Sequence, residues 1–246
     1  MKFQIHNFKT LPSTNTYALD KLADLAHGDV IVAEEQTAGR GRQGRQWQSQ
    51  SGKNLAFSIV FKEELKAEDL HAYSQMTSLA LFDTLNDAGM KDVWIKWPND
   101  LYLGKAKIAG MLCETSFSGQ ACDGLIVGLG LNVNSTLDDF SGLDVPVTSM
   151  IIESFDDEPY KLNEVLSYFL SKFNFYYQKY LNDDFFIAHH LWVVRTELIG
   201  KNVYLLDGER RIEGKVDSFK EDGTLILSRE GKLEAYRCGD LSLRLS

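Results

Sequence analysis

The segment 39–47 combines three glycines with three arginines and ends in a tryptophan: Gly39-Arg40-Gly41-Arg42-Gln43-Gly44-Arg45-Gln46-Trp47. Glycine lets a backbone turn sharply and approach a ligand closely. Arginine supplies a permanently charged, forked donor that fits carboxylate or phosphate. No Asp or Glu occurs between Gln36 and Lys62, although the chain has a formal net charge of −9. The segment therefore predicts a local binding site for a small anion.

Two better-known phosphate motifs match this loop only in part. Gly39, Gly41 and Gly44 have the spacing of a dinucleotide-binding fingerprint, but that motif opens a helix, whereas polar residues and a strand follow here. Gly39 and Gly44 also have Walker A spacing, yet Arg45 and Gln46 stand where that loop needs Lys and Ser or Thr. An exposed charged loop without a task is a third interpretation. The interleaved glycines and the terminal tryptophan favour a binding loop over it.

Three further patterns become informative together. The run 96–100 reads Lys-Trp-Pro-Asn-Asp, a second run extends from Lys107 to Glu114, and 128–132 reads Gly-Leu-Gly-Leu-Asn. Taken singly, they are compatible with a proline turn, a surface lysine and a weak strand. Glycines on alternate positions leave one face of a strand without side chains, which suits a closely approaching ligand.

Bulk properties limit the class of protein. The 246 residues are 44% hydrophobic and 25% charged, as in an ordinary globular protein with one large domain or a medium and a small one. The negative net charge argues against general nucleic-acid binding. The N-terminal residues contain no signal-peptide core, and no stretch reaches membrane-span length, so we expect a cytoplasmic protein. Cys113, Cys122 and Cys238 are expected to be ordinary reduced thiols.

The elements that position these motifs follow from hydrophobic periodicity and turn residues. Helices are predicted from the Ser13 cap to near Gly28, and over 68–88, 162–181 and 185–198. Strands are predicted over 30–33, 55–61, 93–97, 101–103, 108–117 and 125–133. Five short strands then follow over 203–206, 211–216, 225–227, 233–236 and 241–245, which suggests a small barrel. We therefore predict two domains, 1–198 and 199–246.

Jointly, these motifs resemble those of biotin–protein ligases. The matching features are Ser13-Thr14-Asn15 at the first helix, Gln36 before the loop, the runs 39–47, 96–100, 107–114 and 128–132, and a C-terminal Gly-Asp-Leu-Ser-Leu-Arg over 239–244. They occur in the family order and cover essentially the whole chain. Gln43 is the one departure, because many members have an arginine there.

The resemblance implies a fold and an activity. The fold is an α/β (α+β) catalytic domain, like class II aminoacyl-tRNA synthetases, with a mixed sheet and a small C-terminal SH3-like β-barrel. The activity is ATP- and Mg²⁺-dependent formation of biotinyl-5′-AMP, followed by transfer of biotin to a lysine of a carboxylase's biotin carrier domain. Some relatives carry an N-terminal DNA-binding domain, for which residue 13 leaves no room, so no DNA or membrane partner is expected. Monomer and homodimer both stay open.

The resemblance also assigns roles to residues. The biotin-binding set is Ser13, Thr14, Asn15, Gln36, Gly39, Arg40, Gly41, Arg42, Lys107, Gly128 and Gly130. The ATP and adenylate set is Arg42, Arg45, Trp47, Asn99, Asp100, Lys107 and Asn132. Arg42 and Lys107 are the catalytic candidates, and Asp100 is the candidate Mg²⁺ ligand. Two alternatives are a lipoate or octanoate ligase or transferase of the same fold, and a non-catalytic biotin-binding protein; the arginine-rich loop with its tryptophan favours the biotin ligase.

Overall fold

The structure is a computed structural model that describes residues 1–48, 50–62, 70–119, 121–143, 145–155, 158–182, 184–207, 210–237 and 239–243. Several predicted features lie outside these residues. They are Cys238, the first two residues of the helix predicted over 68–88, and the end of the strand predicted over 241–245, with Arg244.

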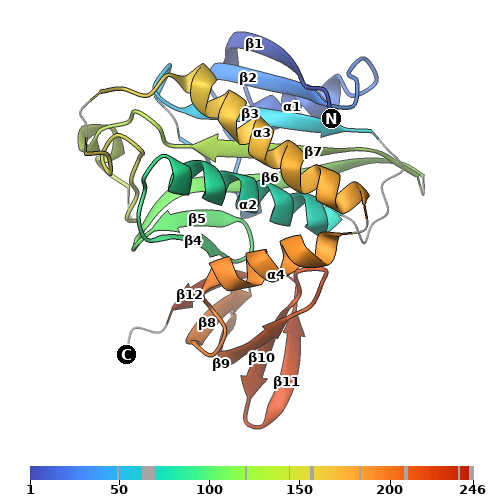
Figure 1. The fold of residues 1–246 in the computed structure, drawn as a ribbon, viewed down its shortest axis with the longest axis vertical. Helices are drawn as coiled ribbons and strands as arrows, with labels where there is room; N and C mark the ends of the chain where they lie inside the picture. Colours follow the sequence, from blue (N-terminus) through green and yellow to red (C-terminus); the bar gives the residue numbers. More distant parts are fainter. Residues whose placement is uncertain are drawn as a thin grey trace.

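A seven-stranded mixed sheet forms the larger part of the molecule, with strand order β1-β2-β3-β7-β6-β5-β4 (Figure 1). Its strands are β1 (Gln4–Leu11), β2 (Asp29–Gln36), β3 (Leu55–Phe61), β4 (Val93–Lys96), β5 (Asp100–Leu103), β6 (Ala106–Ser118) and β7 (Ala121–Leu131). The first two strands pair in parallel, and all other neighbours pair antiparallel. Strand β1 was not predicted, because this edge strand buries only Leu11 fully and lacks a clear hydrophobic alternation.

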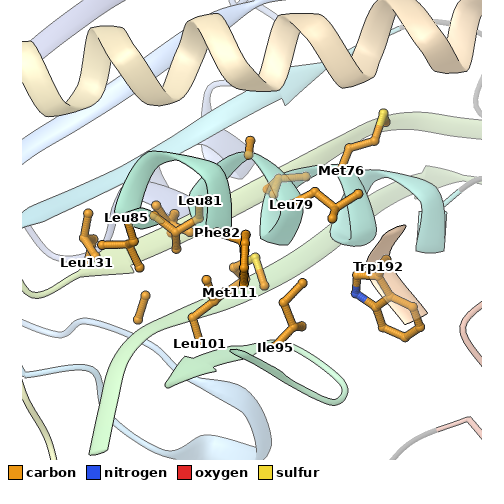
Figure 2. Close-up of a cluster of buried hydrophobic side chains, with 14 of the residues drawn as sticks. Met76, Leu79, Leu81, Phe82, Leu85, Ile95, Leu101, Met111, Leu131 and Trp192 are labelled. Atoms are coloured by element: carbon orange, nitrogen blue, oxygen red, sulfur yellow. The ribbon is translucent and has the colours of Figure 1, made fainter. Parts of the chain in front are cut away.

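Helices cover both faces of this sheet. On one face, α2 (Leu70–Asp87) and α3 (Leu162–Leu181) pack over alternate strand residues such as Phe57 and Leu129. Figure 2 shows side chains of α2 pointing toward Ile95, Leu101 and Met111 of the sheet. Other strand residues, such as Val60 and Ile126, face the other way and form a smaller cluster with Ala18 of α1 (Thr14–Asp20). Since strand side chains alternate between faces, α1 marks the opposite side of the sheet.

The first helix is shorter than predicted. Ser13 caps it by accepting a hydrogen bond from the Thr16 backbone N–H, as expected for a serine N-cap, but the helix ends at Asp20. The Lys62 ammonium donates to the backbone carbonyls of Leu22 and Leu25, at 2.8 Å each. A lysine just after the end of β3 therefore satisfies carbonyls that further helical turns would have used.

The C-terminal residues form a second, five-stranded antiparallel sheet of order β11-β10-β9-β8-β12. The strands are β8 (Asn202–Asp207), β9 (Arg210–Phe219), β10 (Leu225–Arg229), β11 (Lys232–Tyr236) and β12 (Asp240–Leu243). No pairing closes β11 onto β12 within the described part of the chain, so the structure shows a small sheet and not a closed barrel. Helix α4 (Phe185–Thr196) leads into it, and the Trp192 and Phe219 rings meet edge to face at 5.1 Å.

Cys113 and Cys122 are both free thiols, as predicted. Among the helices of the described ranges, none combines the length and the apolar character that crossing a membrane requires.

Candidate active site

A cavity of about 510 Å³ opens on the α1 side of the large sheet. It brings together segments that are far apart in the sequence. The predicted site residues that line it are Ser13, Thr14, Asn15, Gln36, Arg40, Gly41, Arg42, Arg45, Trp47, Asn99, Asp100, Lys107, Gly128, Gly130 and Asn132. Gly39 is the one predicted residue that does not line the cavity.

The floor of the cavity is a row of small residues on neighbouring strands. Gly130 pairs with Ala56 on β3 and with Gly110 on β6, and Gly128 pairs with Ser58 on β3. A Cβ atom on Gly128 would overlap the Asn15 side chain, and one on Gly130 would overlap the Trp47 indole. Both glycines therefore permit close approach to this face of the strand, while the approach of a ligand, which the alternating pattern predicted, stays a prediction. In this structure the approaching groups are the protein's own side chains.

Buried polar side chains at one end of the floor form a connected network. The side-chain oxygen of Gln36, Oε1, accepts from the Thr14 backbone N–H at 2.8 Å. Ser58 Oγ lies 2.7 Å from Thr14 Oγ1 and 2.6 Å from Asn15 Oδ1. Asn15 and Ser58 are 3% and 0% exposed, so these groups depend on one another for hydrogen bonds. The arrangement offers fixed amide and hydroxyl groups to a polar, uncharged ligand head.

The glycine–arginine loop folds back on itself above this floor. The Gly41 N–H donates to the Arg45 carbonyl at 2.7 Å, and the Trp47 N–H donates to the Gly39 carbonyl at 3.0 Å. A Cβ atom on Gly39 would overlap the Trp47 carbonyl oxygen, so glycine is needed there for the loop's own closure. Gln43 has a positive φ of 54°, a conformation that few non-glycine residues adopt.

The cationic side chains of the site each contact a neighbour. Lys107 Nζ lies 2.8 Å from Asp100 Oδ1, and Arg42 donates to Asn99 Oδ1 at 2.9 Å. The Lys107 ammonium also lies 5.7 Å from the centroid of the Trp47 ring. Asn99 and Asp100, from the Trp-Pro-Asn-Asp turn, thus hold the two predicted catalytic cations at the cavity. These contacts leave the cations in place to meet an entering anion.

The described residues contain no group of three or more His, Cys, Asp or Glu side chains arranged to hold a metal ion. Mg²⁺ is commonly bound through one or two carboxylates together with substrate phosphates and water. A single carboxylate at the cavity, that of Asp100, fits such a role.

Sequence reasoning missed several residues that line the cavity. Tyr102 comes from β5 and Leu206 from β8, while Lys96 and Gly239 had been noted only as parts of the runs 96–100 and 239–244 and not as site residues. A further apolar wall consists of Phe140, Leu143, Val145 and Val147. This wall lies between β7 and α3, where no helix or strand was predicted, and its apolar residues between acids were the available signal.

Two contacts hold that wall against the site. Lys53 binds both carboxylate oxygens of Asp139, at 2.6 and 2.9 Å, just before Phe140. The Lys107 N–H donates to the Pro146 carbonyl, and the Thr148 N–H donates to the Lys107 carbonyl, both at 2.9 Å. The backbone of the wall is therefore hydrogen-bonded to the backbone of Lys107, one of the two catalytic candidates.

Comparisons with known proteins agree with this geometry. The family described as "Biotin/lipoate A/B protein ligase family" matches residues 7–132. The bifunctional ligase/repressor BirA of Salmonella typhimurium is 31% identical, over 97% of this chain and 74% of that protein. The biotin–[acetyl-CoA-carboxylase] ligase of Paracoccus denitrificans is 30% identical, over 87% of this chain and 90% of that protein. The biotin protein ligase of Aquifex aeolicus, solved with biotin and ATP, superposes with a TM-score of 0.81 at 28% identity, covering 99% of both chains.

Proposed function

The chain belongs to the biotin/lipoate A/B protein ligase family, and from that premise we propose that it is an ATP-dependent biotin–protein ligase. The observation that carries the proposal is the cavity itself. Arg42 and Lys107 line it beside the polar network and the glycine row, by which we mean Gly110, Gly128 and Gly130 of the cavity floor. The chain is also similar from end to end to a ligase solved with biotin and ATP.

The reaction has two half-reactions. In the first, a carboxylate oxygen of biotin attacks the α-phosphorus of ATP, the α–β phosphoanhydride bond breaks, and pyrophosphate leaves. In the second, the amine of a carrier lysine attacks the carbonyl carbon of biotinyl-5′-AMP. An amide bond forms, AMP leaves, and the amine loses a proton. No covalent bond to the enzyme is required in either step.

The first step brings one anion to another, so fixed positive charge is the main requirement. Preorganised cations lower such a barrier because they need not reorient as charge develops. We assign this role to Arg42 and Lys107, which Asn99 and Asp100 hold at the cavity. Mg²⁺ bound with the triphosphate would neutralise further charge, and Asp100 is our candidate for its protein ligand.

The two ends of the cavity suit different parts of the substrates. We assign the ureido head of biotin to the network of Thr14, Asn15 and Gln36, with Ser13 beside it. The loop residues Arg40 and Gly41, with Gly128 and Gly130 beneath, would line the acyl chain and carboxylate. Arg45, Trp47 and Asn132 would contact the nucleotide. We expect the loop to order further over the bound ligand, because closure keeps water from the mixed anhydride.

The C-terminal sheet and the partners complete the proposal. We propose a domain boundary between residues 198 and 199, with the second sheet corresponding to an SH3-like barrel. The acceptor is proposed to be the biotin carrier domain of a carboxylase such as acetyl-CoA carboxylase, and the reaction to take place in the cytoplasm.

Lipoate or octanoate ligation is the second candidate, because the matching family covers both biotin and lipoate ligases. Acyl-dependent exchange of radiolabelled pyrophosphate into ATP separates the two. Purified protein with Mg²⁺ is given biotin, lipoate or octanoate in parallel. Exchange with biotin alone is the expected result. Exchange with lipoate or octanoate alone would overturn the substrate, and no exchange from folded protein would favour a non-catalytic biotin-binding protein.

A further inference from the structure

Glu114 occupies a position that none of the assigned roles explains. It lies on β6, on the same face as Gly110 and Leu112, and its side chain is 19% exposed. Its two carboxylate oxygens contact different parts of the site. Oε1 lies 2.6 Å from Arg40 Nη2, in the glycine–arginine loop, and Oε2 accepts from Asn15 Nδ2 at 2.9 Å.

Each partner of Glu114 is held by a second contact as well. Arg40 Nη1 donates to Thr16 Oγ1 at 3.3 Å, so this arginine joins the loop to both the sheet and α1. Asn15 Nδ2 also donates to the Leu112 carbonyl at 3.0 Å. With its amino group directed to these two acceptors, the Asn15 amide must turn its oxygen toward Ser58 and the cavity floor.

We propose that Glu114 is a positioning residue, which holds the glycine–arginine loop down on the sheet through Arg40 and fixes the orientation of the Asn15 amide. A carboxylate is required because both contacts need an acceptor, and the arginine contact also uses the negative charge. Glutamine in its place would direct an NH₂ group at one of the two donors. The inference rests on the proposed function only for the identity of the ligand beneath the loop.

The expected size of the effect follows from exposure. The Arg40 side chain is 46% exposed, so solvent screens the pair and its contribution is modest. We expect its loss to raise the equilibrium for loop opening about five-fold, which corresponds to ~1 kcal/mol. The backbone N–H groups of Gly41 and Trp47 report this opening, because their hydrogen bonds lie inside the folded loop.

The test compares hydrogen exchange of residues 39–47 in ligand-free wild type, Glu114→Gln, Arg40→Gln and the double variant. We expect each single variant to exchange about five-fold faster than wild type, at an unchanged melting temperature. The double variant should exchange no faster than either single one, because one contact is lost in all three. In wild type, roughly 1 M NaCl should raise exchange toward the level of the variants, since salt screens an exposed pair.

A matched control removes a similar pair elsewhere. Glu213 Oε1 lies 3.1 Å from Arg211 Nη2 on β9, so Glu213→Gln should leave exchange of the loop unchanged. Wild-type exchange in Glu114→Gln would overturn the proposal. A lowered melting temperature with faster exchange throughout α1 and β6 would also overturn it, because Glu114 would then act in folding alone.

Release of the preformed adenylate adds a functional measurement. If the loop retains the ligand, Glu114→Gln should release labelled biotinyl-5′-AMP up to about five-fold faster than wild type. Equal release rates in the presence of faster loop exchange would overturn the retention role. Wild-type protein that forms no adenylate would contradict the proposed function, while the ligand-free exchange result would still decide whether Glu114 holds the loop.

Discussion

Adding a single methyl group at Gly130 should weaken ligand retention without unfolding the protein. The Cβ atom of Gly130→Ala would overlap the Trp47 indole, which lies over this strand position. Trp47 Nε1 is buried without a hydrogen-bond partner in the described structure, so the ring can move without breaking a side-chain hydrogen bond. The loop that carries Trp47 should therefore shift to relieve the overlap, while the sheet keeps its structure.

The magnitude follows from the cost of overpacking. Introducing a methyl group into a filled space typically costs about 1–3 kcal/mol. If the loop absorbs this cost, closure over the ligand becomes less favourable by the same amount. Release of the adenylate should then accelerate about 5- to 150-fold. The melting temperature should stay close to that of wild type.

Gly128→Ala is the matched control. Its Cβ atom would overlap the Asn15 side chain, which is held by Ser58, the Leu112 carbonyl and Glu114. This neighbour cannot move without breaking buried hydrogen bonds, so the cost should appear as lost stability. At about 2–4 °C per kcal/mol for a chain of this size, the melting temperature should fall by roughly 2–12 °C.

Differential scanning calorimetry and single-turnover release of labelled adenylate measure the two effects. We expect opposite patterns for the two glycines: faster release for Gly130→Ala and lower stability for Gly128→Ala. A Gly130→Ala protein that melts as early as Gly128→Ala, yet releases adenylate at the wild-type rate, would refute it. The overlap would then be relieved by distortion of the sheet and not by movement of the Trp47 indole.

Four further outcomes are expected. Lys107→Ala should slow adenylate formation about 10²-fold or more in a single-turnover assay, because a fixed cation is lost, and a near-normal rate would remove its assigned role. Trp97 is 2% exposed, so Trp97→Ala should cost about 3–5 kcal/mol in urea unfolding, whereas Trp97→Phe, which keeps a six-membered ring but loses the indole hydrogen bond to the Gly223 carbonyl, should cost less. Burial lowers the pKa of His189 below 6.5, so the unfolded chain binds more protons than the folded one between the two pKa values. The stability that neutral His189 allows is therefore present above pH 6.5 and is lost as the pH falls through the pKa of the folded state. His189→Gln should make the urea midpoint less sensitive to pH in that window. Burial raises the pKa of the Cys113 thiol to about 12, so iodoacetamide at pH 8 should leave Cys113 unmodified in native protein, as peptide mapping can check.

Local patterns were sufficient to predict most of the fold. Strands were predicted at the positions of β4 to β7 because apolar runs alternate with turn residues, and Gly104 and Gly119, which lie in two of these turns, adopt positive φ values of 53° and 67°. Strand β1 escaped prediction, since its pairing partner β2 lies beyond α1 and its side chains are mostly exposed. The early end of α1 depends on Lys62, about 40 residues further on.

The candidate site shows the same division. Residue types and motif order predicted which side chains line the cavity, because glycine, arginine and the Asn-Asp turn have recognisable chemistry. The pairings were not accessible from the sequence. Arg40 meets Glu114 across 74 positions and Lys53 meets Asp139 across 86, and nothing in either local sequence indicates the partner. The apolar wall at Phe140 depends on the second of these contacts for its place.

The position of the glycine row has a consequence for how the chain assembles. β4 to β7 connect by short hairpins, while β1, α1, β2 and β3 form a second local group, and the cavity floor lies where β3 meets β7. Local contacts form early, so we expect this seam to close late in folding. Biotin can then bind only the completed molecule and should stabilise it by about 2.7 kcal/mol at one hundred times its Kd. In stopped-flow experiments, biotin should slow unfolding and leave the refolding rate unchanged; faster refolding would place the seam in the folding nucleus.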